Sequence, residues 1–338
     1  MTSLKLSINR DSNTTIQQQL INAISRAIAS NELKQGESLP SINKISRDLT
    51  ISRDTIFKAY QELKRLKVVD STPAKGYYVN NNLRKILLLL DYFSPFKESL
   101  HNTFKKNIPK EYSIDLAFHH YNLQVFETII QNSIGLYDLL VVMNPDTSLF
   151  KIHPVFKKID PSKLLFVDIP IKDWNGFASE KYSTIYQNFD KIVYDELSKI
   201  KDVVLKYDTF NLILERNLNH PEITTEYFIR FCYDIEIECR IYEDLKEVPL
   251  QKGQAYFVLQ QRDLSYLLRQ CQKQDLEPGT DIGILAYNDS PLYEFIGKGI
   301  SVITTDFELM GKKAAETIKG ENINKELIPS KIILRGSL

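Results

Sequence analysis

Side chains that can bind a polyanion are concentrated near the start of the chain. Residues 1–80 carry 12 Lys and Arg against 7 Asp and Glu, although the 338-residue chain has no net formal charge. Ser52 begins a helical pattern, and a helix N-terminus presents backbone N–H groups to a phosphate. Arg53 can bind a guanine edge or a phosphate, and Thr55 and Lys58 lie within reach of the same groups. Three further cations have the same potential: Lys44, Arg47 and Lys75. On composition alone, solvated surface charges are the commoner interpretation.

A second set of polar side chains follows apolar runs in the rest of the chain. In open parallel sheets, ligands bind beyond the carboxyl ends of the strands. Carboxylates and amides pair with sugar hydroxyls, and an aromatic ring packs against the apolar face of a sugar. The groups that follow strand-like runs are Asp91-Tyr92-Phe93, Asp168, Arg262-Asp263 and Asn288-Asp289. They predict a site for a polyol. For Asp168 and Asp289 helix capping is an equal alternative, and the Arg262 guanidinium would also suit a carboxylate or phosphate.

The elements that position the basic residues are three helices and a hairpin. Helical spacing of apolar residues from Ile16 to Ile28 predicts the first helix. Ser41 can cap a second helix that ends at Leu49, and Ser52 can cap a third. The buried stripe of the third helix is Ile56, Tyr60, Leu63 and Leu66. Two short β runs, Val68–Asp70 and Tyr77–Val79, are joined by a turn that contains Pro73 and Gly76, and Gly76 lets this turn approach a surface closely.

The remainder of the chain alternates strand-like runs with helical patterns. This alternation predicts mainly parallel sheets covered on both faces. The polar run of residues 80–82 suggests a hinge, so we expect one domain over 1–80, a linker over 81–84 and a second domain over 85–338. The expected strands are Ile86–Leu90, Ser113–Phe118, Leu139–Met143, Leu164–Asp168, Val203–Tyr207, Ala255–Leu259 and Ile282–Tyr287.

The first domain resembles the GntR family of winged helix-turn-helix regulators. The resemblance covers about residues 14–80 and is carried by Leu39-Pro40-Ser41, Ser52-Arg53-Asp54-Thr55-Ile56 with Ala59 and Leu63, and Gly76-Tyr77-Tyr78-Val79. It implies that the third helix enters the major groove of operator DNA and that the wing lies along the minor groove. Asn43 stands where many members have Arg. The DNA contacts that the resemblance implies are Ser41, Asn43, Lys44, Arg47, Ser52, Arg53, Thr55, Lys58, Lys75 and Gly76.

The second domain resembles LacI-type sensors. The matching segments are Pro278–Asp289, Ile303-Thr304-Thr305-Asp306-Phe307, Met310–Ala315 and Arg335-Gly336-Ser337. The resemblance implies a type I periplasmic-binding-protein fold: two Rossmann-like α/β lobes with a ligand between them. A GntR-like head on such a body is similar to the arabinose-repressor subgroup.

By position in these motifs, Asp168, Arg262 and Asn288 match ligand contacts, and Arg230 is a looser match because the glycine of its motif is missing. Together with Tyr92, Phe93, Asp263 and Asp289 they form the expected effector site. The resemblance also implies three crossings between the lobes, near Gln187, Asp306 and Asn324.

The two resemblances together imply a cytoplasmic repressor whose affinity for double-stranded operator DNA is controlled by a monosaccharide. A DNA regulator with a non-sugar, anionic effector is the alternative. One head reads few base pairs, so we expect a homodimer assembled through the body.

Other classes of protein are less well supported. The chain has no nucleophile elbow or phosphate-binding glycine loop, so we expect no enzyme and no cofactor. An architectural DNA-binding protein would not need the polar strand ends. His119-His120 has no third metal ligand at a recognisable spacing, and Trp174 is more typical of a core or lid residue than of a sugar contact.

Two features of the sequence bear on the compartment. Apolar runs such as Ile86–Leu90 are too short to span a membrane, and the first residues do not read as a signal peptide. The three cysteines, Cys232, Cys239 and Cys271, lack metal-binding or redox spacing and suggest a reducing compartment.

Overall fold

The computed structural model describes residues 7–30, 32–73, 75–80, 84–143, 154–169, 181–187, 191–215, 223–320 and 323–338. The chain divides into two compact units, each described by itself. The first comprises Met1–Asp91, Pro109–Val142 and His153–Leu165, and the second comprises Tyr92–Ile108, Met143–Ile152 and Phe166–Leu338. None of the helices in the described residues is long and apolar enough to cross a membrane.

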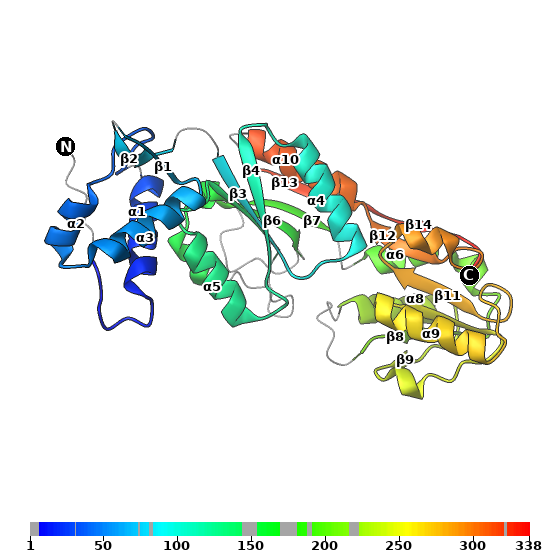
Figure 1. The fold of residues 1–338 in the computed structure, drawn as a ribbon. Helices are drawn as coiled ribbons and strands as arrows, with labels where there is room; N and C mark the ends of the chain where they lie inside the picture. Colours follow the sequence, from blue (N-terminus) through cyan, green and yellow to red (C-terminus); the bar gives the residue numbers. More distant parts are fainter. Residues whose placement is uncertain are drawn as a thin grey trace. The chain divides into compact units, whose positions relative to one another are not determined.

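The N-terminal part of the first unit is a three-helix winged fold (Figure 1). Each helix starts where a hydroxyl side chain accepts a hydrogen bond from a backbone N–H of the first turn: Thr15, Ser41 and Ser52 are these caps. The helices are α1 (Ile16–Ala29), α2 (Ile42–Leu49) and α3 (Arg53–Arg65), followed by the antiparallel strands β1 (Val69–Thr72) and β2 (Gly76–Val79). The predicted helices and hairpin are confirmed.

The winged fold has a hydrophobic core of its own. Leu20 and Ile24 from α1 and Ile56 and Leu63 from α3 are fully buried in it. The buried Tyr60 hydroxyl donates to the Pro40 carbonyl at 2.7 Å, which fixes α3 against the start of α2. The apolar stripe predicted for α3 is therefore the face that packs, and the opposite face of α3 remains available.

Six strands form the sheet that follows the winged fold in sequence, in the order β13-β7-β6-β5-β3-β4. The pairs β3–β4, β3–β5 and β7–β13 are parallel. The strands are β3 (Arg84–Leu90), β4 (Tyr112–Phe118), β5 (Leu139–Val142), β6 (Leu164–Ile169), β7 (Ser183–Gln187) and β13 (Lys325–Ile328). The associated helices are α4 (Pro95–Asn107), α5 (Leu123–Ser133) and α10 (Phe307–Lys319), with short 3₁₀ turns at Pro154–Lys158 and Pro161–Lys163.

The second sheet, in the order β14-β12-β11-β10-β8-β9, lies in the second unit. Its neighbours pair in parallel except for the antiparallel β12–β14. The strands are β8 (Thr209–Ile213), β9 (Ile241–Tyr242), β10 (Gln254–Val258), β11 (Gly283–Tyr287), β12 (Ser301–Thr305) and β14 (Ser330–Ile333). The helices are α6 (Ile192–Ser198), α7 (Lys201–Val204), α8 (Ile223–Asp234) and α9 (Gln261–Lys273), with 3₁₀ turns at Leu245–Glu247 and Pro291–Phe295.

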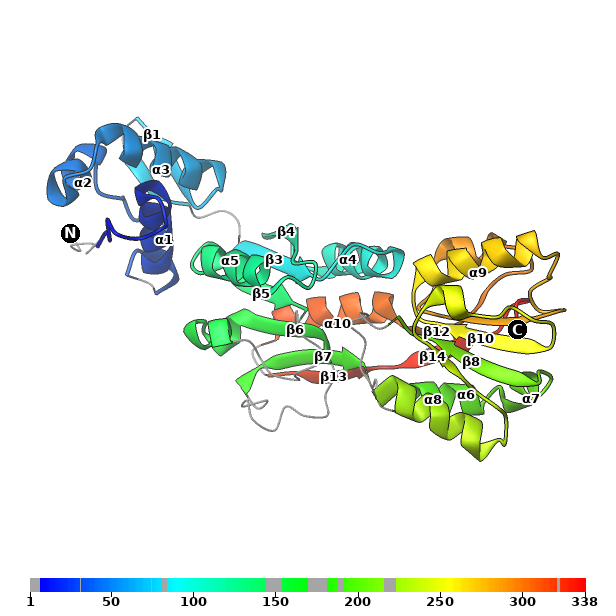
Figure 2. The same ribbon diagram turned by 90° about the horizontal axis from the view of Figure 1, so that it is seen from below.

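Both faces of this second sheet are covered by helices (Figure 2). Ala255 and Phe257 of β10 pack with α6 and α8, whereas Tyr256 and Val258 of the same strand pack with α9. Successive side chains of a strand point to opposite faces, so a strand covered on both faces needs a continuous apolar run. The fold class predicted from the sequence, a winged helix-turn-helix followed by two parallel α/β sheets, is confirmed.

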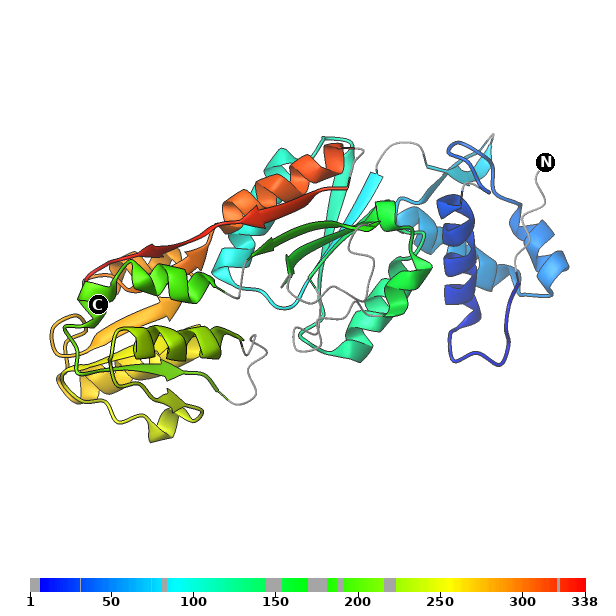
Figure 3. The same cartoon turned by 180° about the vertical axis from the view of Figure 1, so that it is seen from behind.

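Three segments pass from one sheet to the other within the second unit. They follow β7 after Gln187, join β12 to α10 at Asp306, and join β13 to β14 at Pro329. Figure 3 shows β13 and β14 (red) as consecutive strands of this last passage. The expectation of a third crossing near Asn324 was wrong, because Asn324 precedes β13 and the chain changes sheets at Pro329.

One predicted strand was also wrong. Val203–Tyr207 reads as a strand because of its β-branched and aromatic residues, but the structure has the helix α7 up to Val204 and the strand β8 only from Thr209. Leu197, Ile200 and Val204 are all buried in one core cluster, and their spacing of three and four residues is helical. The helical spacing of Val204 from these two upstream residues therefore outweighed the strand propensity of the segment.

A close contact between α4 and α10 makes Gly311 a sensitive position. A Cβ atom at Gly311 would lie 2.3 Å from the Leu100 carbonyl oxygen, whereas a Cβ at Gly320 meets nothing closer than 3.6 Å. We expect Gly311→Ala to lower the free energy of unfolding by about 1–3 kcal/mol through overpacking. Gly320→Ala should stay within about 0.5 kcal/mol of wild type. Urea denaturation measures both; equal midpoints would contradict the close packing of these helices.

Candidate functional sites

The first candidate site is the surface of α2, α3 and the wing. Asn43, Lys44 and Arg47 of α2 are exposed, as are Arg53 and Lys58 of α3. The wing adds two further exposed residues, Lys75 and Gly76. Gly76 has a φ of +70°, a conformation that L side chains rarely adopt, so the wing turn favours glycine. The predicted DNA contacts thus lie at exposed positions of α2, α3, their caps and the wing, except for Thr55, which is half-buried.

Several of these side chains already have partners. Ser41 and Ser52 cap their helices, and the Ser52 and Thr55 hydroxyls lie 2.7 Å apart. Lys58 forms an exposed ion pair with Asp54 at 2.7 Å. Such a pair contributes about 0–1 kcal/mol, so a phosphate can compete for the ammonium. The Lys75 ammonium lies 4.6 Å from the centre of the Tyr78 ring, which orients it on the wing.

Two residues on the exposed face of α3 were missed by sequence reasoning. Phe57 is 46% exposed, four residues after Arg53 and therefore on the same face of the helix. Gln61 is exposed one turn further, and its amide donates to the Tyr77 hydroxyl at 2.8 Å, which joins α3 to the wing. The signal in the sequence was their helical spacing from Arg53, off the buried stripe.

The second candidate site lies in the second unit, where β6 and β11 end. Asp168 and Asn288 both have left-handed backbone conformations, with φ of +54° and +62°. The Gln187 amide donates to the Asp168 carboxylate, and the Tyr287 hydroxyl approaches the Gln187 amide oxygen at 3.4 Å. Burial and the Asp168 charge raise the pKa of Tyr287. Gln187 and Tyr287 therefore bring Asp168 and the end of β11 into one network.

Asn288 carries a buried acceptor. Its Oδ1 atom is buried and has no hydrogen-bond partner within the described part of the chain. A buried polar atom without a partner costs free energy, so such a position favours a ligand that donates a hydrogen bond.

Arg262 and Asp263 lie in the first turn of α9, beyond the end of β10. The Arg262 guanidinium pairs with the carboxylate of Glu215, a residue that follows β8 and that sequence reasoning missed. Asp263 is fully buried, and its Oδ2 has no partner among the described residues. Burial and the Glu215 charge raise the Asp263 pKa to about 6, against the opposing effect of Arg262.

The remaining predicted effector residues have different surroundings. Asp289 accepts from the Arg335 guanidinium at 3.0 and 2.8 Å, which ties the end of β11 to the C-terminal segment. Arg230 is exposed in the middle of α8, over the Tyr194 ring and beside Asp234, away from the strand ends. Tyr92 and Phe93 are exposed before α4. Trp174 lies outside the described residues.

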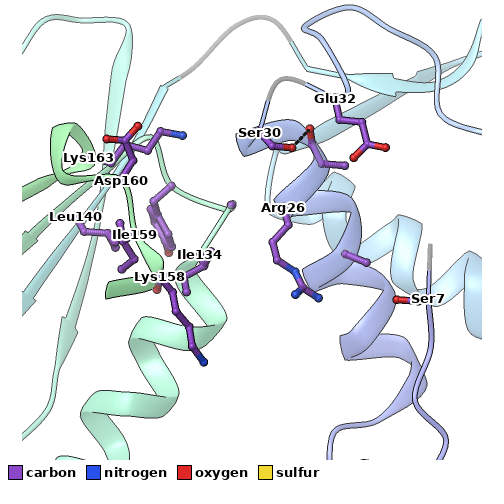
Figure 4. A pocket seen from close by; sticks show the side chains of 15 residues that line it. Ser7, Arg26, Ser30, Glu32, Ile134, Leu140, Lys158, Ile159, Asp160 and Lys163 are labelled. Atoms are coloured by element: carbon purple, nitrogen blue, oxygen red, sulfur yellow. Dashed lines mark hydrogen bonds between the residues drawn. The ribbon is translucent and has the colours of Figure 1, made fainter. Parts of the chain in front are cut away.

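The first unit contains a cavity of about 590 Å³ that none of the predicted site residues lines. Figure 4 shows Arg26 and Glu32 on one side and Lys158, Asp160 and Lys163 on the other. This mixture of charges favours no single class of ligand. In the described residues no three His, Cys, Asp or Glu side chains converge as metal ligands, and His119 of the His119-His120 pair is fully buried.

The raised pKa of Asp263 predicts a pH-dependent stability. Between the ordinary carboxyl pKa of about 3.9 and the native value of about 6, the native state holds a proton that the unfolded state has lost. Wild-type stability should therefore fall as pH rises from 4 to 6 by more than that of Asp263→Asn, which lacks this titration. Urea midpoints at pH 4.5 and pH 7.5 measure the difference; parallel pH profiles would contradict it.

Comparison with known proteins identifies the winged part. Residues 16–79 match the gntR family of bacterial regulatory proteins. The HTH-type transcriptional repressor YtrA of Bacillus subtilis (strain 168) is 26% identical over 83 residues, which are 25% of this chain and 64% of YtrA. The chain thus spans less than two thirds of the length of this relative.

Solved structures match the part of the chain with the two sheets. The trehalose repressor from Escherichia coli has a TM-score of 0.61 at 11% identity, over 74% of this chain and 99% of the other. A LacI family transcriptional regulator from Lactobacillus casei with bound glucose has a TM-score of 0.60 at 12% identity, over 75% of this chain and 100% of the other. Residues 16–79 are therefore a gntR-family helix-turn-helix, and the two-sheet body has the type I periplasmic-binding-protein-like fold of LacI-family regulators.

Proposed function

We propose that the protein is a transcriptional repressor whose affinity for operator DNA is controlled by a small sugar. Residues 1–80 bind the DNA, residues 81–84 link the parts, and residues 85–338 bind the effector and form a homodimer. The observation that carries this proposal is the presence in one chain of an exposed, basic gntR-type helix-turn-helix and a body that shares its fold with sugar-bound regulators.

The α3 face supports direct contact with DNA bases and phosphates. Arg53, Phe57 and Lys58 form a continuous exposed surface on the helix, and Lys75 extends from the wing. Arg pairs with guanine or phosphate, Lys binds phosphate, and an exposed Phe can contact a thymine methyl group. A head of this size covers one half-site, so a symmetric dimer on a palindrome supplies the remaining affinity.

The chemistry of the second site supports a polyhydroxyl effector. Two buried oxygen atoms that accept hydrogen bonds, Asn288 Oδ1 and Asp263 Oδ2, have no partner in the described residues. Sugar hydroxyls donate to such atoms, whereas a carboxylate has no proton to donate at neutral pH and a phosphate monoester is mostly in its dianionic form. The alternative of an anionic effector relied on Arg262, but Glu215 already pairs with its guanidinium. The sugar is therefore the better-supported ligand.

The DNA part of the proposal predicts distinct effects for two variants. Arg53→Ala should weaken binding to a duplex selected by the wild-type chain by about 1–3 kcal/mol, with a loss of sequence preference. Lys75→Ala should weaken all duplexes similarly and flatten the salt dependence. Arg65→Ala removes the same charge from the last turn of α3, where Arg65 pairs with Glu62, and serves as the control. Fluorescence anisotropy with all three variants tests this; equal losses would contradict the assigned surface.

The effector part predicts stabilisation by a monosaccharide. A thermal-shift panel that includes D-glucose, D-ribose and L-arabinose should contain a sugar that raises the Tm of the full chain, because ligand binding to the native state stabilises it. Asn288→Gly keeps the left-handed backbone but removes the amide, so it should fold normally and lose about tenfold or more in sugar affinity.

A matched glycine variant separates binding from folding. Asp275 is exposed and has a φ of +54°, so Asp275→Gly changes a comparable backbone position outside the site. It should retain the sugar response. A panel of sugars without any shift, or an unchanged response in Asn288→Gly, would reject the assigned effector site.

A further inference from the structure

Gln187 lies at the centre of a buried side-chain network in the second unit. It is the last residue of β7 and is only 2% exposed. Its Nε2 donates to the Asp168 carboxylate, and its Oε1 accepts from the Thr305 hydroxyl at 2.5 Å and faces the Tyr287 hydroxyl at 3.4 Å. The Thr305 and Ser330 hydroxyls lie 2.7 Å apart. Since Thr305 uses its proton toward Gln187, Ser330 donates to Thr305.

The members of this network occupy all three passages between the sheets. Gln187 ends β7 at the first passage, Thr305 ends β12 at the second, and Ser330 begins β14 directly after the third. Asp168, the penultimate residue of β6, has a left-handed conformation, which costs free energy for a residue other than glycine unless its surroundings hold it. The Gln187 amide thus contacts Asp168 on one side and, on the other, the Thr305–Ser330 pair that borders the second and third passages.

We propose that Gln187 is a positioning residue that couples Asp168 to the three passages, so that the Asp168 carboxylate and the geometry of the passages change together. The role of Asp168 as an effector contact rests on the function proposed above. A ligand that binds the Asp168 carboxylate alters the hydrogen bond between this carboxylate and the Gln187 amide. Because the Gln187 amide oxygen accepts from Thr305, which in turn accepts from Ser330, the positions of these two residues change as well. By reciprocity, any rearrangement of the passages changes the affinity at Asp168 by the same factor.

The network can be tested without the effector by hydrogen–deuterium exchange of the full-length, ligand-free chain. Gln187→Met keeps the side-chain volume and removes both hydrogen bonds, so the backbone amides that border the passages, those of Gln187, Asp306 and Ser330, should exchange about tenfold faster or more. Gln187→Glu should have a similar effect, because it places a second carboxylate against Asp168. The double variant Asp168→Asn with Gln187→Glu reverses donor and acceptor, and its exchange should return toward wild type.

A buried amide elsewhere in the same unit provides the control. Asn211 of β8 is 1% exposed and bonds to Thr209 and to the Arg240 backbone. Asn211→Leu should accelerate exchange near β8 and leave the passages unchanged. The proposal is overturned if Gln187→Met leaves the passages as protected as in wild type, if its effect is uniform across the unit, or if the double variant shows no recovery. Failure of the sugar panel would remove the effector role of Asp168 but leave this result unaffected.

Discussion

The body of this protein depends on a hydrogen-bonded junction between two sheets, the second of which is covered by helices on both faces. Strands that pass from one sheet to the other bring polar side chains into a region that is buried from water. These buried polar groups need hydrogen-bond partners, and the Gln187 amide supplies two of them: it donates to Asp168 and accepts from Thr305. Because an unpaired buried polar group costs about 1–3 kcal/mol, the positions of these strand ends are interdependent.

This junction also explains why candidate ligand contacts gather at the strand ends. Interior strand positions such as Phe257 are occupied by core packing, whereas residues just beyond a strand, such as Asn288, keep polar side chains next to the passages. A ligand held there contacts groups whose positions depend on the arrangement of the passages. The winged part is organised differently: its basic surface lies on short helices fixed by their caps and by Tyr60, and a small core holds the elements together.

The sequence predicted the winged part well because its signals are local. Ser41 and Ser52 mark the helix starts, and the apolar stripe of α3 gives its buried face. The body was predicted less completely. The continuous apolar run of β3 was recognisable, but β7, β13 and β14 are short and mix polar with apolar residues, so they carry little strand signal. Val203–Tyr207 failed because helical burial with upstream residues outweighed β propensity.

The junction itself could not be predicted from local patterns, since it joins residues more than a hundred positions apart, such as Gln187 and Thr305. The apolar runs correctly indicated that Asp168 and Asn288 would lie close to the ends of strands, but their left-handed conformations were not predicted. Arg230, which was included on a looser motif match, lies exposed on α8 beside Asp234. The ion pair between Arg262 and Glu215 could not be predicted either, because Glu215 follows β8, a strand that the sequence had not indicated.

The central claim is that ligand binding in the body changes DNA binding by the winged part. The most direct measurement is the Kd of the full-length chain for its selected duplex, at fixed salt, without sugar and with a saturating concentration of the sugar that stabilises it most. Our account predicts that the Kd changes by about fivefold or more, the range of ordinary allosteric coupling. An identical Kd under both conditions, with sugar binding verified by calorimetry on the same sample, would contradict it.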